Sequence, residues 1–110
     1  MEKIKFKRLS WVEEFLEGEG INGEDIKSIL DDLSGAILEN LMRSKELKKV
    51  NNDPAIYYFR KRLRGINYRF MGPKDGDCIY LLHAFKKKSR EIPQDDLEVA
   101  IKRAETFTQK

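Results

Sequence analysis

The residues best suited to chemistry are basic ones, and they gather in one stretch of the chain, residues 57–90. This stretch holds ten of the 22 lysine and arginine residues but only two of the 19 acidic residues. Guanidinium groups bind phosphate oxygens through paired hydrogen bonds, so several of them on one surface would hold a nucleic-acid backbone. The remaining residues carry a net negative charge, although the whole chain carries +3. We therefore expect a basic sheet supported by acidic helices.

Two turn signals divide this stretch into three strands. Gly65-Ile66 is expected to form one two-residue loop and Asp75-Gly76 the other. With these loops Arg62 lies opposite Arg69, and Arg69 lies opposite Leu82. One face of the sheet is then expected to carry Tyr58, Arg60, Arg62, Arg64, Asn67, Arg69, Met71, Tyr80, Leu82, Ala84 and Lys86. The other face, expected to meet the core, carries Phe59, Leu63, Tyr68, Phe70, Ile79, Leu81, His83 and Phe85.

The flanking segments predict the elements that position this sheet. Residues 3–8 alternate between lysine or arginine and apolar side chains, which is typical of a strand at a sheet edge. Ser10 and Glu13 fit a capping box, so a short helix is expected to follow and to end at Gly18 or Gly20. An apolar stripe from Ile26 to Leu41 predicts a second helix that begins near residues 22–23.

Residues 45–52 are expected to form a polar connection, and Pro93 is expected to begin a C-terminal helix. Together these elements predict a single α+β domain spanning residues 1–110. Its fold is a small twisted, mainly antiparallel sheet of about four strands, with an N-terminal helical hairpin packed on one face and a C-terminal helix. The chain is long enough for one such domain and too short for two.

Composition excludes several classes of protein. One cysteine, Cys78, cannot form an internal disulfide, and a single histidine without a CxxC motif argues against a zinc site built by the protein. No apolar run approaches the roughly 20 residues of a membrane span. The first residues are not followed by an apolar segment, so no signal peptide is expected. We therefore expect a cytoplasmic protein with no metal, no cofactor and no membrane partner.

Two interpretations of the arginines stay open, a solvated basic face and an anion site. Like charges on one face of a sheet destabilise it, which favours a bound anion. Tyr58 or Tyr80 would then be available to stack on a base. The run from Lys86 to Lys88 is either a solvated strand end or part of the phosphate site. His83 falls on the core face and is interpreted first as a packed, hydrogen-bonded residue.

Four motifs follow one another in an order typical of a known family. They are Y-R-F at residues 68–70, D-G at 75–76, L-L-H-A-F-K-K-K-S at 81–89 and A-I-K-R at 100–103. Together they resemble the HigB and phage Gp49-like toxins of the RelE/ParE superfamily. The resemblance covers residues 53–103, and the run at residues 81–89 is its most specific part.

The resemblance implies a toxin of a type II toxin–antitoxin pair that cuts mRNA in the ribosomal A site without a metal. Its partners would be the ribosome, mRNA and a neutralising antitoxin, usually of the helix-turn-helix type. Carried over by position, the catalytic basic residues fall on Arg60, Arg62, Arg69 and Lys87. His83 is the reserve acid or base if the register differs by one residue.

Other residues are expected to bind RNA phosphates or bases around these four. They are Arg64, Lys86, Lys88, Tyr58 and Tyr80. Relatives often carry a glutamate where this chain has Tyr58, so a carboxylate base at that position is absent. The expected reaction is attack of the RNA 2′-hydroxyl on the adjacent phosphorus, which leaves a 2′,3′-cyclic phosphate. Arginine stays charged, so Lys87 or Lys86 is the better proton carrier.

Two rival functions stay open. A ParE-like gyrase inhibitor shares the fold but needs no arginine cluster for phosphate chemistry. A non-enzymatic phage-derived module that binds nucleic acid or protein would cause no growth arrest when expressed.

Overall fold

The computed structural model describes residues 3–21, 24, 36–45, 47–50, 55–63, 65–86 and 93–108 of the chain. Its strands are β1 (Lys3–Arg8), β2 (Ala36–Ile37), β3 (Leu47–Val50), β4 (Ile56–Leu63), β5 (Ile66–Gly72), β6 (Lys74–Asp75), β7 (Cys78–Leu81) and β8 (His83–Lys86). Its helices are α1 (Ser10–Gly18), α3 (Leu38–Arg43) and α4 (Gln94–Thr108).

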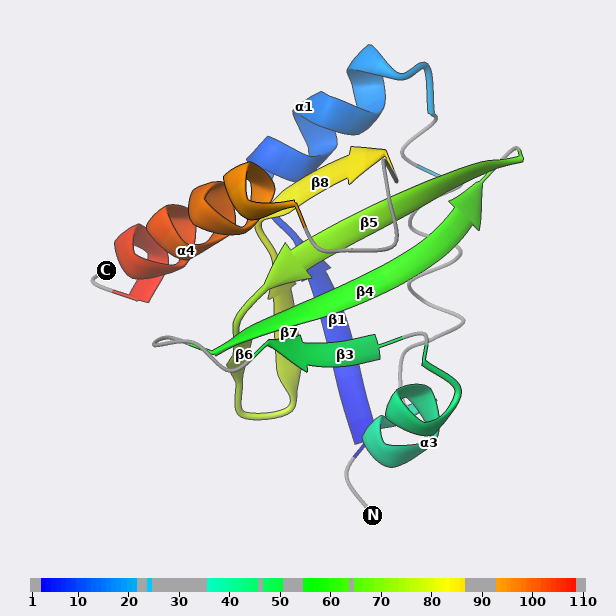
Figure 1. Ribbon diagram of the computed structural model, residues 1–110, viewed down its shortest axis with the longest axis vertical. Helices are drawn as coiled ribbons and strands as arrows, with labels where there is room; N and C mark the ends of the chain where they lie inside the picture. Colours follow the sequence, from blue (N-terminus) through cyan, green and yellow to red (C-terminus); the bar gives the residue numbers. More distant parts are fainter. Residues whose placement is uncertain are drawn as a thin grey trace.

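The described strands form two four-stranded sheets, ordered β2-β1-β7-β6 and β3-β4-β5-β8 (Figure 1). Among the described strand pairs, β1 with β7 is parallel and the others are antiparallel. Together with the C-terminal helix α4, this arrangement confirms the expected α+β class with mainly antiparallel strands. It is consistent with a RelE-like fold.

The N-terminal strand and helix form where the sequence predicts them. β1 is not an edge strand, however, because it lies between β2 and β7, whose residues are distant in sequence. Helix α1 ends at Gly18, as expected, and it buries Val12 and Leu16. The capping box does not form, because Leu9 is the N-cap residue and no side chain caps the helix.

Two segments differ from the expected elements. The predicted second helix falls largely on residues 22–35, most of which lie outside the described ranges. The predicted C-terminal end of this helix is wrong, because Ala36–Ile37 forms β2, which pairs with Lys3 and Ile4, before α3 begins. Residues 47–50, expected to be a polar connection, form β3 paired with β4. The fully buried Leu47 anchors this strand in the core.

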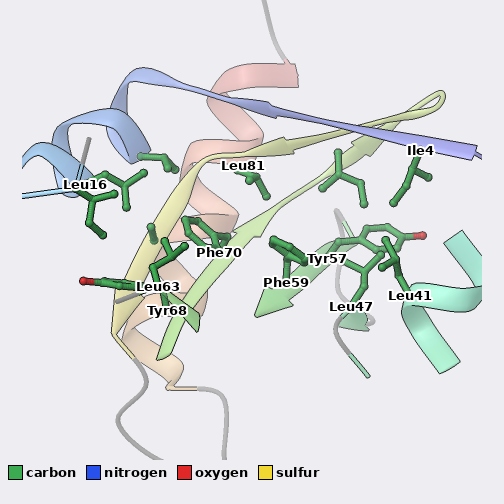
Figure 2. Packing of buried hydrophobic residues seen from close by; sticks show 14 of the residues in the cluster. Ile4, Leu16, Leu41, Leu47, Tyr57, Phe59, Leu63, Tyr68, Phe70 and Leu81 are labelled. Atoms are coloured by element: carbon green, nitrogen blue, oxygen red, sulfur yellow. The ribbon is translucent and has the colours of Figure 1, made fainter. Parts of the chain in front are cut away.

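Apolar side chains fill the space between the two sheets. Figure 2 shows Tyr57, Phe59 and Phe70 from the second sheet beneath Ile4 and Leu81 from the first. Packing there includes aromatic contact between the sheets, since the Phe6 and Phe59 ring centres are 4.8 Å apart. One face of the β3-β4-β5-β8 sheet is therefore closed by the other sheet.

Helix α4 covers part of the opposite face of that sheet. Its apolar stripe of Leu97, Ala100 and Ala104 is buried. These residues pack in one cluster with Ile56, Tyr58, Met71, Leu82 and Phe85. α4 also lies beside α1 (Figure 1), where the Arg103 guanidinium carbon is 5.0 Å from the centre of the Trp11 ring. No helix within the described ranges is long and apolar enough to cross a membrane.

The first hairpin turns one residue earlier than expected. Leu63 pairs with Ile66, so Gly65 takes the second loop position, with φ of +80°. The cross-strand pairing therefore shifts by two residues, and Arg60 rather than Arg62 lies opposite Arg69. A shift of two residues keeps every side chain on its expected face.

The second hairpin turns one residue later than expected, at Gly76-Asp77, because Asp75 pairs with Cys78. It also contains a β-bulge that the sequence did not predict. Tyr80 N–H donates to the Pro73 carbonyl and Leu82 N–H donates to the Met71 carbonyl. Two residues, Leu81 and Leu82, therefore lie opposite Gly72 alone. One extra residue on one strand reverses the faces of all residues beyond it.

The bulge overturns the expected placement of the last strand. Arg69 lies opposite Phe85, and Met71 lies opposite His83. His83 and Phe85 therefore share the face of Arg69, whereas Ala84 and Lys86 lie on the face toward the other sheet, with Phe70 and Tyr68 as their partners.

Candidate functional site

The three arginines expected to act together lie on one face of β4 and β5. Arg60 is directly opposite Arg69, and Arg62 is opposite Asn67. We call this surface the arginine face, and its members are Lys48, Tyr58, Arg60, Arg62, Asn67, Arg69, Met71, His83 and Phe85. One end of it lies under α4, and the end with Arg60 and Arg62 is exposed.

Arg69 is held in one orientation by its neighbours. Its side chain is 7% exposed, and Nη1 donates to the Tyr68 carbonyl at 3.3 Å. Its guanidinium carbon lies 5.9 Å from the centre of the Tyr58 ring. Burial raises the pKa of the Tyr58 phenol, while the charge of Arg69 and a hydrogen bond to it act in the opposite direction. A buried cation without a carboxylate partner is costly, and an anion would offset this cost.

Arg60 and Arg62 are exposed beside this fixed group. Arg60 Nη2 donates to the Ser44 carbonyl at 3.4 Å. Within the described part of the chain, none of Arg60, Arg62 and Arg69 forms an ion pair with a carboxylate. Directly opposed like charges destabilise a strand pair by a few tenths to one kcal/mol. The arrangement is therefore suited to an anion that all three can contact.

His83 is bonded to helix α4 through both of its ring nitrogens. Nε2 lies 2.8 Å from Asp96 Oδ1, and Nδ1 lies 3.4 Å from Arg103 Nη1. Because a guanidinium group can only donate, Nδ1 accepts this bond and the Nε2 proton is donated to Asp96. Arg103 also donates to the Leu82 carbonyl at 3.0 Å, and its burial lowers its pKa.

Asp96 and Arg103 were missed by the sequence reasoning. They lie 13 and 20 residues from His83, on helix α4, which packs on the face of the sheet to which the bulge brings His83. An acidic residue in the first turn of a helix is also favoured by the helix dipole, so Asp96 carried no separate signal of a role in the site.

The placement expected for Lys86 is wrong. It lies opposite Tyr68 on the face toward the other sheet, and its Nζ is 2.7 Å from Glu19 Oε1. Hydrogen bonding to Glu19 and the charge of that carboxylate raise the pKa of Lys86. The Tyr68 hydroxyl donates to the same carboxylate oxygen at 3.3 Å.

The two tyrosines expected to stack on bases are engaged elsewhere. Tyr58 is 8% exposed and lies beneath Arg69, so its ring offers no surface to a base. Tyr80 lies on β7 in the other sheet, and its ring centre is 4.7 Å from that of Phe107. Arg64, Lys87 and Lys88 lie outside the described residues, and their roles stay predictions.

Lys48 is a member of the arginine face that the sequence reasoning did not identify. It is exposed and lies directly opposite Tyr58 on β4. Residues 45–52 were expected to form a polar connection and not a strand, so the sequence could not assign Lys48 to a face of the sheet.

The chain also contains a pocket of about 240 Å³ near β1 and α1. Its lining residues are Arg8, Glu13, Leu16, Glu17 and Ile21. None of them belongs to the arginine face. The basic cluster therefore lies on a different surface from this pocket.

Comparison with known proteins gives one family. The family model described as phage-derived protein Gp49-like matches residues 24–105. The matched range includes β3 to β8, most of α4, and so the whole arginine face. No curated protein and no solved structure matches the chain significantly.

Proposed function

Because the chain belongs to the phage-derived Gp49-like family, which is of the RelE-like toxin type, we propose that it is the toxin of a type II toxin–antitoxin pair. In this proposal it is a HigB-like endoribonuclease that cuts mRNA on the ribosome. The observation that carries the proposal is the pair Arg60 and Arg69, which lie directly opposite each other and have no carboxylate partner among the described residues.

The arginine face supplies what phosphodiester cleavage requires. The RNA 2′-hydroxyl attacks the adjacent phosphorus, the O2′–P bond forms, and the O5′–P bond breaks to leave a 2′,3′-cyclic phosphate. Arg69, fixed by Tyr68 and Tyr58, contacts the phosphate oxygens as negative charge develops on them. Donors that are already oriented toward developing charge contribute strongly to catalysis. Arg60 and Arg62 hold the same phosphate and its neighbour.

Two protons move in this reaction, one from the 2′-hydroxyl and one to the departing 5′-oxygen. His83 is the residue on the arginine face whose ring nitrogens can both donate and accept a proton. Asp96 fixes the ring through Nε2, which leaves Nδ1 as the atom that accepts a proton once the 3.4 Å bond from Arg103 to Nδ1 is broken, while Arg103 keeps its bond to the Leu82 carbonyl. A base oriented by a carboxylate is a recurring catalytic arrangement. Lys87 stays the candidate for the second proton.

The proposed partners follow from the exposed charge. Arg60 and Arg62 would meet mRNA in the ribosomal A site. A cognate antitoxin, expected to be of the helix-turn-helix type, would cover these arginines with an acidic segment and so block RNA.

Mapping of mRNA ends tests the proposal. The purified chain is added to ribosomes carrying a defined mRNA, and the 5′ and 3′ ends of the products are identified. We expect cuts that require the ribosome, with a 2′,3′-cyclic phosphate at the upstream end. Intact mRNA together with inhibited gyrase would replace the proposal with the ParE-like function. Intact mRNA without growth arrest would indicate a non-enzymatic binding module.

A further inference from the structure

Strand β3 places two adjacent lysines on opposite faces of the sheet. Lys48 lies opposite Tyr58, which belongs to the arginine face, and Lys49 lies opposite Tyr57, which belongs to the core between the sheets. Both lysines are exposed. Lys48 and Lys49 are therefore alike in type and exposure but lie on opposite faces of the sheet.

Lys48 continues the line of cations across the sheet. Lys48 pairs with Tyr58, which lies two residues before Arg60 on β4, so Lys48 and Arg60 are diagonal neighbours on the same face. Diagonal neighbours are about 7–8 Å apart, and long side chains at this distance can contact each other or a shared ligand. Arg60 in turn lies directly opposite Arg69. The three cations thus occupy three neighbouring strands, β3, β4 and β5.

The described residues offer Lys48 no internal partner. No carboxylate among them is paired with its ammonium group. Lysines at a sheet edge prevent pairing with other chains, and β3 lies at the edge of its sheet. That role applies equally to Lys48 and Lys49, so it does not explain why one of them continues the arginine face.

We propose that Lys48, Arg60 and Arg69 form a track for the backbone of single-stranded RNA that crosses strands β3, β4 and β5. The inference rests on the proposed function and extends its site by one strand. Lysine presents a mobile point charge, which suits contact with a phosphate irrespective of base. Lys48 and Arg60 are the exposed cations of this track, and the aromatic residues of the arginine face are buried, so the track contacts the backbone and not the bases.

Binding of an uncleavable RNA tests the track separately from catalysis. A single-stranded oligonucleotide with 2′-O-methyl groups is titrated with wild-type protein, Lys48→Ala and Lys49→Ala at several salt concentrations. A lost phosphate contact lowers the slope of log affinity against log salt by about 0.7 for a single strand. We expect this loss for Lys48→Ala and an unchanged slope for Lys49→Ala, with Lys48→Arg like wild type.

Equal slopes for Lys48→Ala and Lys49→Ala, or no RNA binding by the wild-type protein, would overturn the track. Thermal unfolding of both variants shows that each keeps the fold. Failure of the proposed function has a different signature, because RNA would bind with the expected dependence on Lys48 while ribosome-bound mRNA stayed intact.

Discussion

At the scale of single residues, the arginine face combines a fixed cation with mobile ones. Arg69 is buried between the Tyr58 ring and the Tyr68 carbonyl, whereas Arg60 and Arg62 are exposed. A fixed guanidinium group can be oriented before the reaction begins, and exposed ones can follow the substrate. Arg69 is therefore the residue on which we expect catalysis to depend most.

Replacing Arg69 with lysine tests this expectation. Lysine keeps the positive charge but loses the planar fork that contacts two oxygens at once. We expect cleavage of ribosome-bound mRNA to fall by about 10²–10³-fold, as for removal of an oriented donor. Single-turnover cleavage assays measure the effect.

Lys86→Ala is the matched control for that substitution. Lys86 lies in another of the motifs that carry the family resemblance but is paired with Glu19 on the other face, so cleavage should stay near the wild-type rate. A large loss with Lys86→Ala and none with Arg69→Lys would contradict the assignment of faces.

At the scale of elements, the bulge at Gly72 decides which residues join the site. It exchanges the two faces of β8 relative to those of β5, and so brings the His83 side chain to the arginine face. The bulge requires close approach of two backbones, since a Cβ atom on Gly72 would lie 1.6 Å from the Tyr80 carbonyl oxygen. Glycine is therefore required at this position for steric reasons.

Gly72→Ala should destabilise the protein by about 1–3 kcal/mol or more, because the backbone of β7 must move to admit a methyl group. Urea unfolding followed by circular dichroism measures the change. Gly18→Ala is the control, since a Cβ atom there meets nothing within 4 Å. Equal stability of Gly72→Ala and wild type would show that the bulge is not constrained as described.

The sequence predicted those elements whose signals are local. β1, α1 and α4 follow from alternation, from helical spacing of apolar residues, and from Gly18 and Pro93 at their ends. The shared face of Arg60, Arg62 and Arg69 was also predictable, because an error of two residues in register preserves it.

The other features of the fold and of the site depend on contacts between residues that are distant in sequence. The bulge places the neighbours Leu82 and His83 on the same face of the sheet, and no local signal distinguishes this sequence from one of continuous alternation. The face of Lys86, the bond between His83 and Asp96, and the strand that carries Lys48 all follow from such contacts.

At the scale of the whole molecule, two apolar clusters keep the basic sheet in place. One lies between the two sheets, and the other lies under α4. Together they bury the framework of β4 and β5 while Lys48, Arg60 and Arg62 stay exposed at the far end of the arginine face. The fold therefore presents, on a rigid support, cations that have no carboxylate partner among the described residues, and such cations are suited to binding a flexible polyanion.

Comparison of Arg60→Ala with Lys61→Ala in cleavage of ribosome-bound mRNA tests the central claim most directly. The two residues are adjacent and carry the same charge, but Lys61 lies opposite Tyr68 and therefore on the other face. We expect Arg60→Ala to lose most of its cleavage activity and Lys61→Ala to retain it. Equal activity of the two variants would contradict a function that depends on the arginine face.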